Sequence, residues 1–224
     1  MANHSFLNVW LTSLPEEKIL ERFGAFLATV PFSATRPGFT HLTIRAVDST
    51  EAPVLEQDFR STPLDAAGIV ELVGEQLHSD SSYEVACAWD LSTFDAGQGK
   101  STLEPQLLQI VCRGEDFDGG FWRDNGHFEV NLGFEHFFTG HAGLLGLRPG
   151  AKAAPQSEEE ARFLEAMAWP DNLDKYQKQT RENIRKLQDW IRRIESSLPV
   201  ESTRLWSEGE ENFEARLDEI VSAR

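Results

Sequence analysis

The spacing of apolar residues in the first ninety positions constrains the fold most, because it alternates between the period of a strand and that of a helix. Residues 6–11 read as a strand, and Ser13 to Glu16 has the spacing of a capping box that opens a helix reaching about residue 30. Residues 42–46 alternate apolar and polar side chains, and a weaker strand covers 54–60. A second cap followed by a helix begins at 62–65, and residues 83–91 read as another strand.

This order of elements predicts an α+β fold. Strand, helix, strand, strand, helix, strand is the order of a ferredoxin-like βαββαβ core, in which two helices pack on one face of an antiparallel sheet. Two later strand-like runs, residues 107–113 and 126–134, are expected to extend that sheet with further antiparallel strands or to cover its other face. We therefore predict one sheet domain over residues 1–146.

The remaining third of the chain is predicted to be a C-terminal helical extension, residues 157–224, after a linker over 147–156 rich in small residues, Gly and Pro. A capping box at Ser157 opens a short helix, and a long helix is predicted over about 171–198. The long helix carries a narrow apolar stripe that requires a partner. The simplest partner is a last helix from about residue 207, which would make a helical hairpin; the alternative is a homodimer through residues 173–198.

The charge balance limits the classes of partner. The 224 residues carry a formal charge of −16, and positions 51–150 hold 17 acidic but only five basic residues. Such a body repels nucleic acid phosphates, whereas it attracts a basic protein in a manner that salt weakens. Nucleic acid is therefore an unlikely partner.

Two further features concern the compartment. No apolar run is long enough for a membrane helix, and the first residues do not form a signal peptide, so no membrane contact is expected. Cys87 and Cys112 both lie in apolar, strand-like runs, which fits a reducing compartment. A cytoplasmic protein is the expectation.

Residues 125–141 form the most suggestive stretch for chemistry. If residues 126–134 form a strand, His127, Glu129 and Asn131 share its polar face. Imidazole and carboxylate groups are ligands for zinc and other divalent metals, and an open coordination position would activate water for hydrolysis. The candidate metal ligands are His127, Glu129, Glu135, His136 and His141. Their spacing matches no established ligand motif, and the simpler interpretation is a solvated sheet face.

A second polar face lies on the strand at 42–46, where His41, Thr43 and Arg45 point the same way and could bind a small ligand. No catalytic signature accompanies either face. The leading hypothesis is therefore a non-catalytic binding protein whose acidic body recognises a basic protein, as an inhibitor or immunity-type protein does, and which needs no cofactor. A metal-dependent hydrolase that uses His127, Glu129, His136 and His141 is the first alternative, and a small-ligand-binding module is the second.

Overall fold

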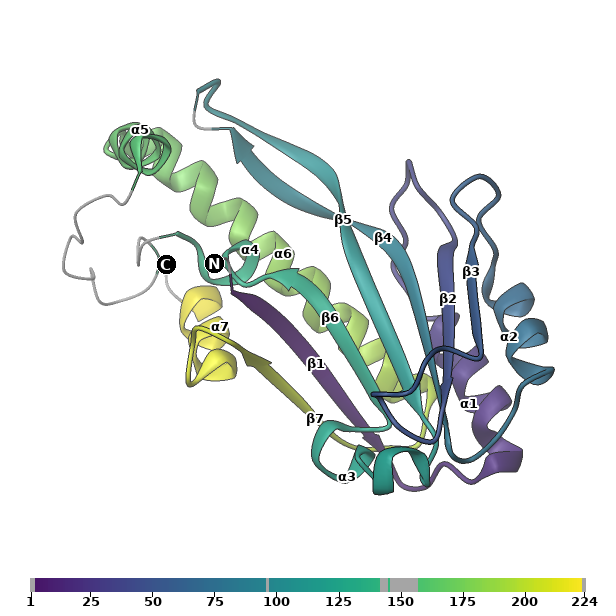
Figure 1. The fold of residues 1–224 in the computed structure, drawn as a ribbon. Coiled ribbons are helices and arrows are strands. Elements are labelled where there is room, and N and C mark those ends of the chain that lie inside the picture. Colours follow the sequence, from purple (N-terminus) through teal and green to yellow (C-terminus); the bar gives the residue numbers. More distant parts are fainter. Residues whose placement is uncertain (1–2, 96, 142–144, 146–156, 223–224) are drawn as a thin grey trace.

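The centre of the molecule is a seven-stranded sheet in the order β3-β2-β4-β5-β6-β1-β7 (Figure 1). We analysed a computed structural model, which describes residues 3–95, 97–141, 145 and 157–222. Each pair of neighbouring strands is antiparallel. The strands are β1 (His4–Leu11), β2 (Phe39–Ala46), β3 (Leu55–Asp58), β4 (Ser81–Asp95), β5 (Lys100–Arg113), β6 (Phe128–Phe134) and β7 (Val200–Ser207).

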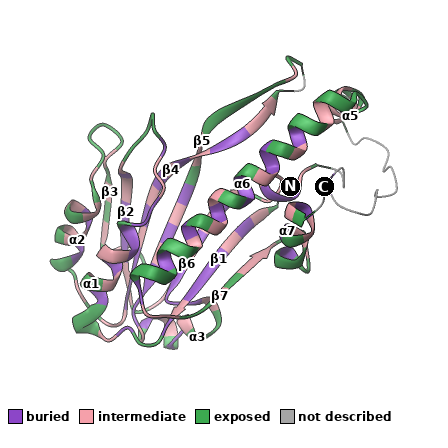
Figure 2. Cartoon of the chain, turned by 180° about the vertical axis from the view of Figure 1, so that it is seen from behind, coloured by how far each residue is buried: buried purple, intermediate pink, exposed green. Residues whose placement is uncertain are grey.

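Helices cover one face of this sheet. Figures 1 and 2, drawn from opposite sides, show α1, α2 and α6 on the same side, while the described residues place no helical layer on the other side. The helices are α1 (Glu16–Leu27), α2 (Ala66–Gly74), α3 (Trp122–Asn125), α4 (His136–Thr139), α5 (Glu158–Met167), α6 (Pro170–Ser197) and α7 (Phe213–Ser222), with a short 3-10 turn at Phe117–Gly119. Within the described ranges, none of them combines the length and apolar character that crossing a bilayer requires.

The α+β class and the predicted element order over the first ninety residues are both found in the structure. The ferredoxin-like core is not confirmed, because the sheet inserts β5 and β6 between β4 and β1. The four strands of the predicted core therefore do not form a contiguous sheet of their own. The two later strand-like runs, predicted at residues 107–113 and 126–134, correspond to β5 and β6. These two strands are in the middle of the sheet, where β5 forms a long hairpin with β4 and pairs with β6 on its other side.

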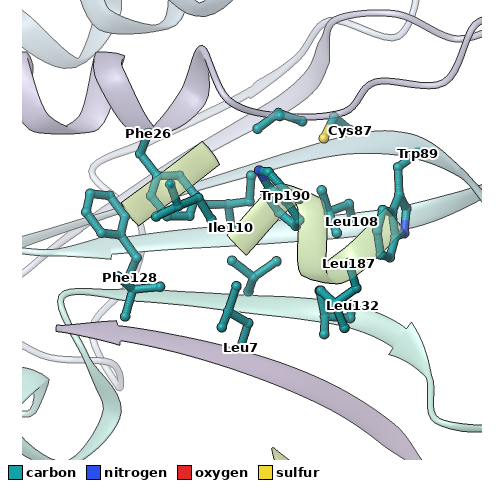
Figure 3. Packing of buried hydrophobic residues seen from close by; sticks show 14 of the residues in the cluster. Leu7, Phe26, Cys87, Trp89, Leu108, Ile110, Phe128, Leu132, Leu187 and Trp190 are labelled. Carbon is teal, nitrogen blue, oxygen red and sulfur yellow. The ribbon is translucent and has the colours of Figure 1, made fainter. Parts of the chain in front are cut away.

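The long helix forms where predicted, but its apolar stripe packs on the sheet. Ile184, Leu187 and Ile194 have no exposed surface, and neither does Trp190, whose Nε1 donates to Thr29 Oγ1 at 2.9 Å. Figure 3 shows Trp190 and Leu187 among side chains of the sheet and of α1. Because the chain itself occupies the stripe, the predicted homodimer through residues 173–198 receives no support.

The predicted helical hairpin needs a correction, because a strand lies between its two helices. β7 follows α6 and pairs with β1 from Leu11↔Val200 to Ser5↔Ser207. The last helix, α7, does contact α6, since Arg181 Nε donates to the carbonyl oxygen of Ile220 at 3.1 Å. Residues 157–222 therefore contribute helices and a strand to one shared core. The predicted linker, 147–156, lies outside the described residues.

Candidate functional site

The sheet face opposite the helical layer, called the open face below, carries the polar residues that the sequence singles out on two separate strands. The strand register aligns Thr43 with Glu84, Glu84 with Val111, and Val111 with Glu129. The next row, in the same strand order, runs through His41, Ala86, Gln109 and Asn131. The predicted binding residues of β2 and β6 thus lie on one face, three strand spacings or about 14 Å apart.

Side-chain hydrogen bonds link several strands across the open face. His4 Nδ1 lies 3.0 Å from Asn131 Oδ1, Asn131 Nδ2 donates to Gln109 Oε1 at 3.4 Å, and Gln109 Nε2 donates to Glu84 Oε1 at 3.4 Å. An ion pair of 3.2 Å joins Arg113 to Glu129. These contacts hold polar groups in fixed positions on a surface that remains accessible, which suits recognition of a partner.

On β2, His41 and Thr43 are joined, because His41 Nε2 lies 3.0 Å from Thr43 Oγ1. His41 also approaches Glu56 on the neighbouring strand, at 3.7 Å. Arg45 is half-buried on the same face. A cavity of about 490 Å³ nearby is lined by other residues, among them Arg36, Thr40, Arg60, Cys87 and Leu107. None of the three residues of the small-ligand hypothesis lines that cavity.

His127 precedes β6 and is fully buried, so it does not share the accessible polar surface of Glu129 and Asn131. The ring of Trp122 stacks on it with centroids 4.2 Å apart, and its Nδ1 accepts the backbone N–H of Leu11 at 3.0 Å. Its Nε2 has no hydrogen-bond partner in the structure and lies 3.7 Å from a carboxylate oxygen of Glu115. Burial lowers the pKa of His127, and Glu115 opposes that shift. A neutral imidazole in this position serves to tie β1 to β6.

The other two histidines of the predicted metal set lie beyond the opposite end of β6. The rings of His136 and His141 stack with centroids 4.6 Å apart and an angle of 6° between their planes. They line a cavity of about 180 Å³ together with Tyr176 and Phe163. Burial and the neighbouring His141 lower the pKa of His136 to about 4.

The five predicted metal ligands are not gathered in one place. Glu129 pairs with Arg113, and Glu135 accepts the backbone N–H of Gly209 at 3.1 Å. His127 lies at one end of β6, whereas His136 follows the other end. In the described part of the chain, no group of three or more His, Cys, Asp or Glu side chains could hold a metal ion. The arrangement thus offers no support for the hydrolase alternative.

A feature that sequence reasoning did not locate is an acidic end of the sheet. It lies where β2 and β5 end and β4 begins. Glu16 accepts the N–H of Ser79 at 2.9 Å, and Asp116 accepts the Ser79 hydroxyl at 2.7 Å. The loop after β2 joins the same group, because Val47 N–H donates to the Asp80 carbonyl oxygen and its own carbonyl accepts Asp118 N–H, both at 2.8 Å.

We define the acidic end by six carboxylates: Glu16, Asp48, Asp80, Glu115, Asp116 and Asp118. None of the six is buried, and among the described residues none pairs with a lysine or arginine. The excess of acidic residues over positions 51–150 signals such a surface. Only the fold shows that residues from four distant segments meet there.

Sequence reasoning also missed the aromatic side chains that β7 brings to the open face. The rings of Phe6 and Trp206 stack with centroids 4.4 Å apart, and the Arg204 guanidinium lies 5.4 Å from the centre of the Trp10 ring. The sequence contains a signal for the strand β7, because Val200, Thr203 and Trp206 are residue types that favour strands.

The two thiols are structural. Cys87 and Cys112 are both free and buried, and burial raises the pKa of Cys87 to about 12. A thiol with so high a pKa is almost entirely protonated at neutral pH, and the thiolate is the reactive form. Cys87 is therefore not a nucleophile in the folded protein.

Comparisons with family models, with curated proteins and with solved structures found no match to this chain.

Proposed function

We propose that the chain is a non-catalytic binding protein that recognises a basic protein through the acidic end of its sheet and the adjoining open face. The observation that carries the proposal is the set of six accessible carboxylates, drawn from four segments, without lysine or arginine pairing among the described residues. Neighbouring groups of like charge repel one another, and a cationic partner relieves that repulsion.

The open face supports the proposal because it supplies contact area beside the charge. Most sheets of this kind bury one face and leave the other to solvent, so an uncovered face alone would not indicate binding. Here it carries the stacked Phe6 and Trp206 rings next to fixed polar groups, and aromatic residues are enriched where proteins meet. Charge would steer the partner, and the aromatic and polar groups would hold it.

The proposal includes a cytosolic location and, by analogy of charge, an inhibitor or immunity-type role against a cationic nuclease or toxin. The two free, buried cysteines support a reducing compartment. The analogy rests on charge complementarity, which governs partner choice and association rate in such complexes.

A capture experiment with charge variants tests the proposal. Immobilised protein should retain basic proteins at about 0.05 M salt and release them at about 0.5 M, because screening shortens the range of charge interactions. Asp116→Asn with Asp118→Asn should lose these proteins, since the amides keep an acceptor oxygen for Ser79 and Ser49 but remove the charge.

The matched control neutralises two exposed carboxylates in the helical layer, one on α2 and one at its C-cap, with Glu71→Gln and Glu75→Gln. This variant should retain the same proteins. Equal losses in the two variants would show that only total charge matters, and retention that is indifferent to salt would contradict the proposal.

A further inference from the structure

One edge of the sheet is a second candidate contact, and it suggests how a partner is held. β7 is the last strand in the order, with eight residues, and among the described residues a strand pairs with it on one side only. An edge strand directs the N–H and C=O groups of alternate residues away from the sheet, where another strand can pair with them. The opposite edge, β3, has only four residues.

The hydrogen bonds of β7 show which residues face outward. The N–H of Leu205 donates to the Glu214 carboxylate at 2.7 Å, so this amide points away from β1. Thr203 has the same parity, and its amide is expected to point the same way. The Glu214 carboxylate thus occupies the position where the carbonyl oxygen of a neighbouring strand would accept from Leu205. A carbonyl oxygen of an incoming strand can replace this carboxylate, and the Leu205 N–H then keeps a hydrogen-bond acceptor.

The surroundings of β7 favour a cationic segment. Between Val200 and Ser222 the chain has seven acidic and two basic residues. One of the two, Arg216, already pairs with Glu219 at 2.7 Å, and the other, Arg204, lies over the Trp10 ring. The carboxylates that flank the strand are Glu201, Glu208, Glu210, Glu211 and Glu214.

A shallow depression of about 600 Å³ lies along this strand. Its lining includes Thr203 with the carboxylates of Glu201 and Glu214, and also two basic residues, Arg123 and Arg204. Trp122 also lines it, and the Nε1 of this residue donates to the Glu115 carbonyl at 3.0 Å. This contact to the backbone of Glu115 places the depression beside the segment that follows β5.

We propose that an extended, lysine- or arginine-rich segment of a partner protein adds to the free edge of β7 as an eighth strand. This inference rests on the proposed function, because it names the form in which the basic partner binds. Main-chain hydrogen bonds to Thr203 and Leu205 hold the segment, and the flanking carboxylates select basic side chains.

The test uses a synthetic peptide of about eight residues with alternating lysine and threonine, labelled for fluorescence anisotropy. Thr203→Pro removes the outward N–H and places a ring at the edge, a position that tolerates proline in sheets. Thr203→Val keeps the N–H and is the matched control. Thr203→Pro should weaken peptide binding at least about fivefold, whereas Thr203→Val should bind as the unchanged protein does.

A second arm does not depend on the folding of a variant. The same peptide with an N-methyl group on every residue has no N–H donor on either edge, and it should bind the unchanged protein at least about fivefold more weakly. Hydrogen exchange at the Thr203 amide should slow when the unmodified peptide is added.

The outcomes separate the two proposals. Salt-sensitive binding that is equal for Thr203→Pro, Thr203→Val and the methylated peptide would overturn strand addition and leave recognition of basic partners in place. No binding of the unmodified peptide by the unchanged protein at low salt would overturn both.

Discussion

Asn183 should be among the most costly polar residues to replace, because its amide joins three elements in the core. Its Oδ1 accepts the N–H of Ser92 at 2.8 Å, and its Nδ2 donates to the carbonyl oxygens of Ser92 and Phe137, both at 3.0 Å. Asn183 is 2% exposed, so water does not readily replace these bonds. The side chain thus fixes α6 against β4 and α4.

Asn183→Leu keeps a similar volume but leaves three buried backbone groups without a partner. Each such group costs about 1–3 kcal/mol, of which partial rearrangement recovers some, so we expect a loss of about 3–5 kcal/mol. The assay is urea unfolding followed by tryptophan fluorescence, with the free energy extrapolated to water. Glu182→Ala, at an exposed position next in the helix, should change stability by less than about 0.5 kcal/mol.

The reasoning would be refuted if Asn183→Leu lost less than about 1 kcal/mol at an unchanged slope. That result would mean that α6 is not held against β4 through this amide. A loss of several kcal/mol in Glu182→Ala would equally contradict the assignment of faces on the helix.

Three further predictions concern the core and its titration. The pKa of His136 falls from 6.5 to about 4 on folding, so the unfolded chain binds a proton first as the pH falls. About 3 kcal/mol of stability should therefore be lost between about pH 6.5 and pH 4. His136→Phe should remove that loss from the pH profile of the unfolding free energy. Trp190→Ala should cost about 3–5 kcal/mol in urea unfolding, whereas Trp169→Ala, at a side chain 70% exposed, should cost less than about 0.5 kcal/mol. Cys87 should react with a thiol reagent only after denaturant is added; rapid labelling of the native protein, followed by mass spectrometry, would contradict its burial.

Much of the local structure could be predicted because it depends on local patterns. The stripe with Ile184, Leu187 and Ile194 has a helical period, and it forms part of α6. The pattern predicts that one side of the helix is buried, but it does not predict which surface of the protein covers that side. A sheet face and a second helix satisfy the same stripe. In the structure Ile184, Leu187 and Ile194 are buried in the core shared with the sheet, and α7 also contacts α6.

The order of the strands could not be predicted, because pairing between distant segments leaves little trace in one sequence. β1 pairs with β6 and β7, which lie more than a hundred residues further along the chain. Parity did predict that Glu129 and Asn131 share a face. It could not predict that Trp122 covers His127, since that contact depends on how the segment before β6 turns back over the sheet.

The acidic end illustrates the same limit for the candidate site. Composition showed the excess of acidic residues, whereas the position of Glu16 beside Ser79 and Asp116 depends on where α1 begins relative to the turn before β4. The predicted capping box at Ser13 is also not formed, because α1 begins at Glu16 without a side-chain cap and the Glu16 carboxylate binds Ser79 instead.

The central claim is that a basic partner contacts the acidic end and the open face, and chemical-shift mapping tests it most directly. Isotope-labelled protein would be titrated with a basic protein recovered by capture, and the amide shifts followed residue by residue. The account predicts the largest changes at residues 47–51 and 114–120 and along β1 and β7. Changes confined to residues 17–27, to α2 and to the outer side of α6 would contradict it.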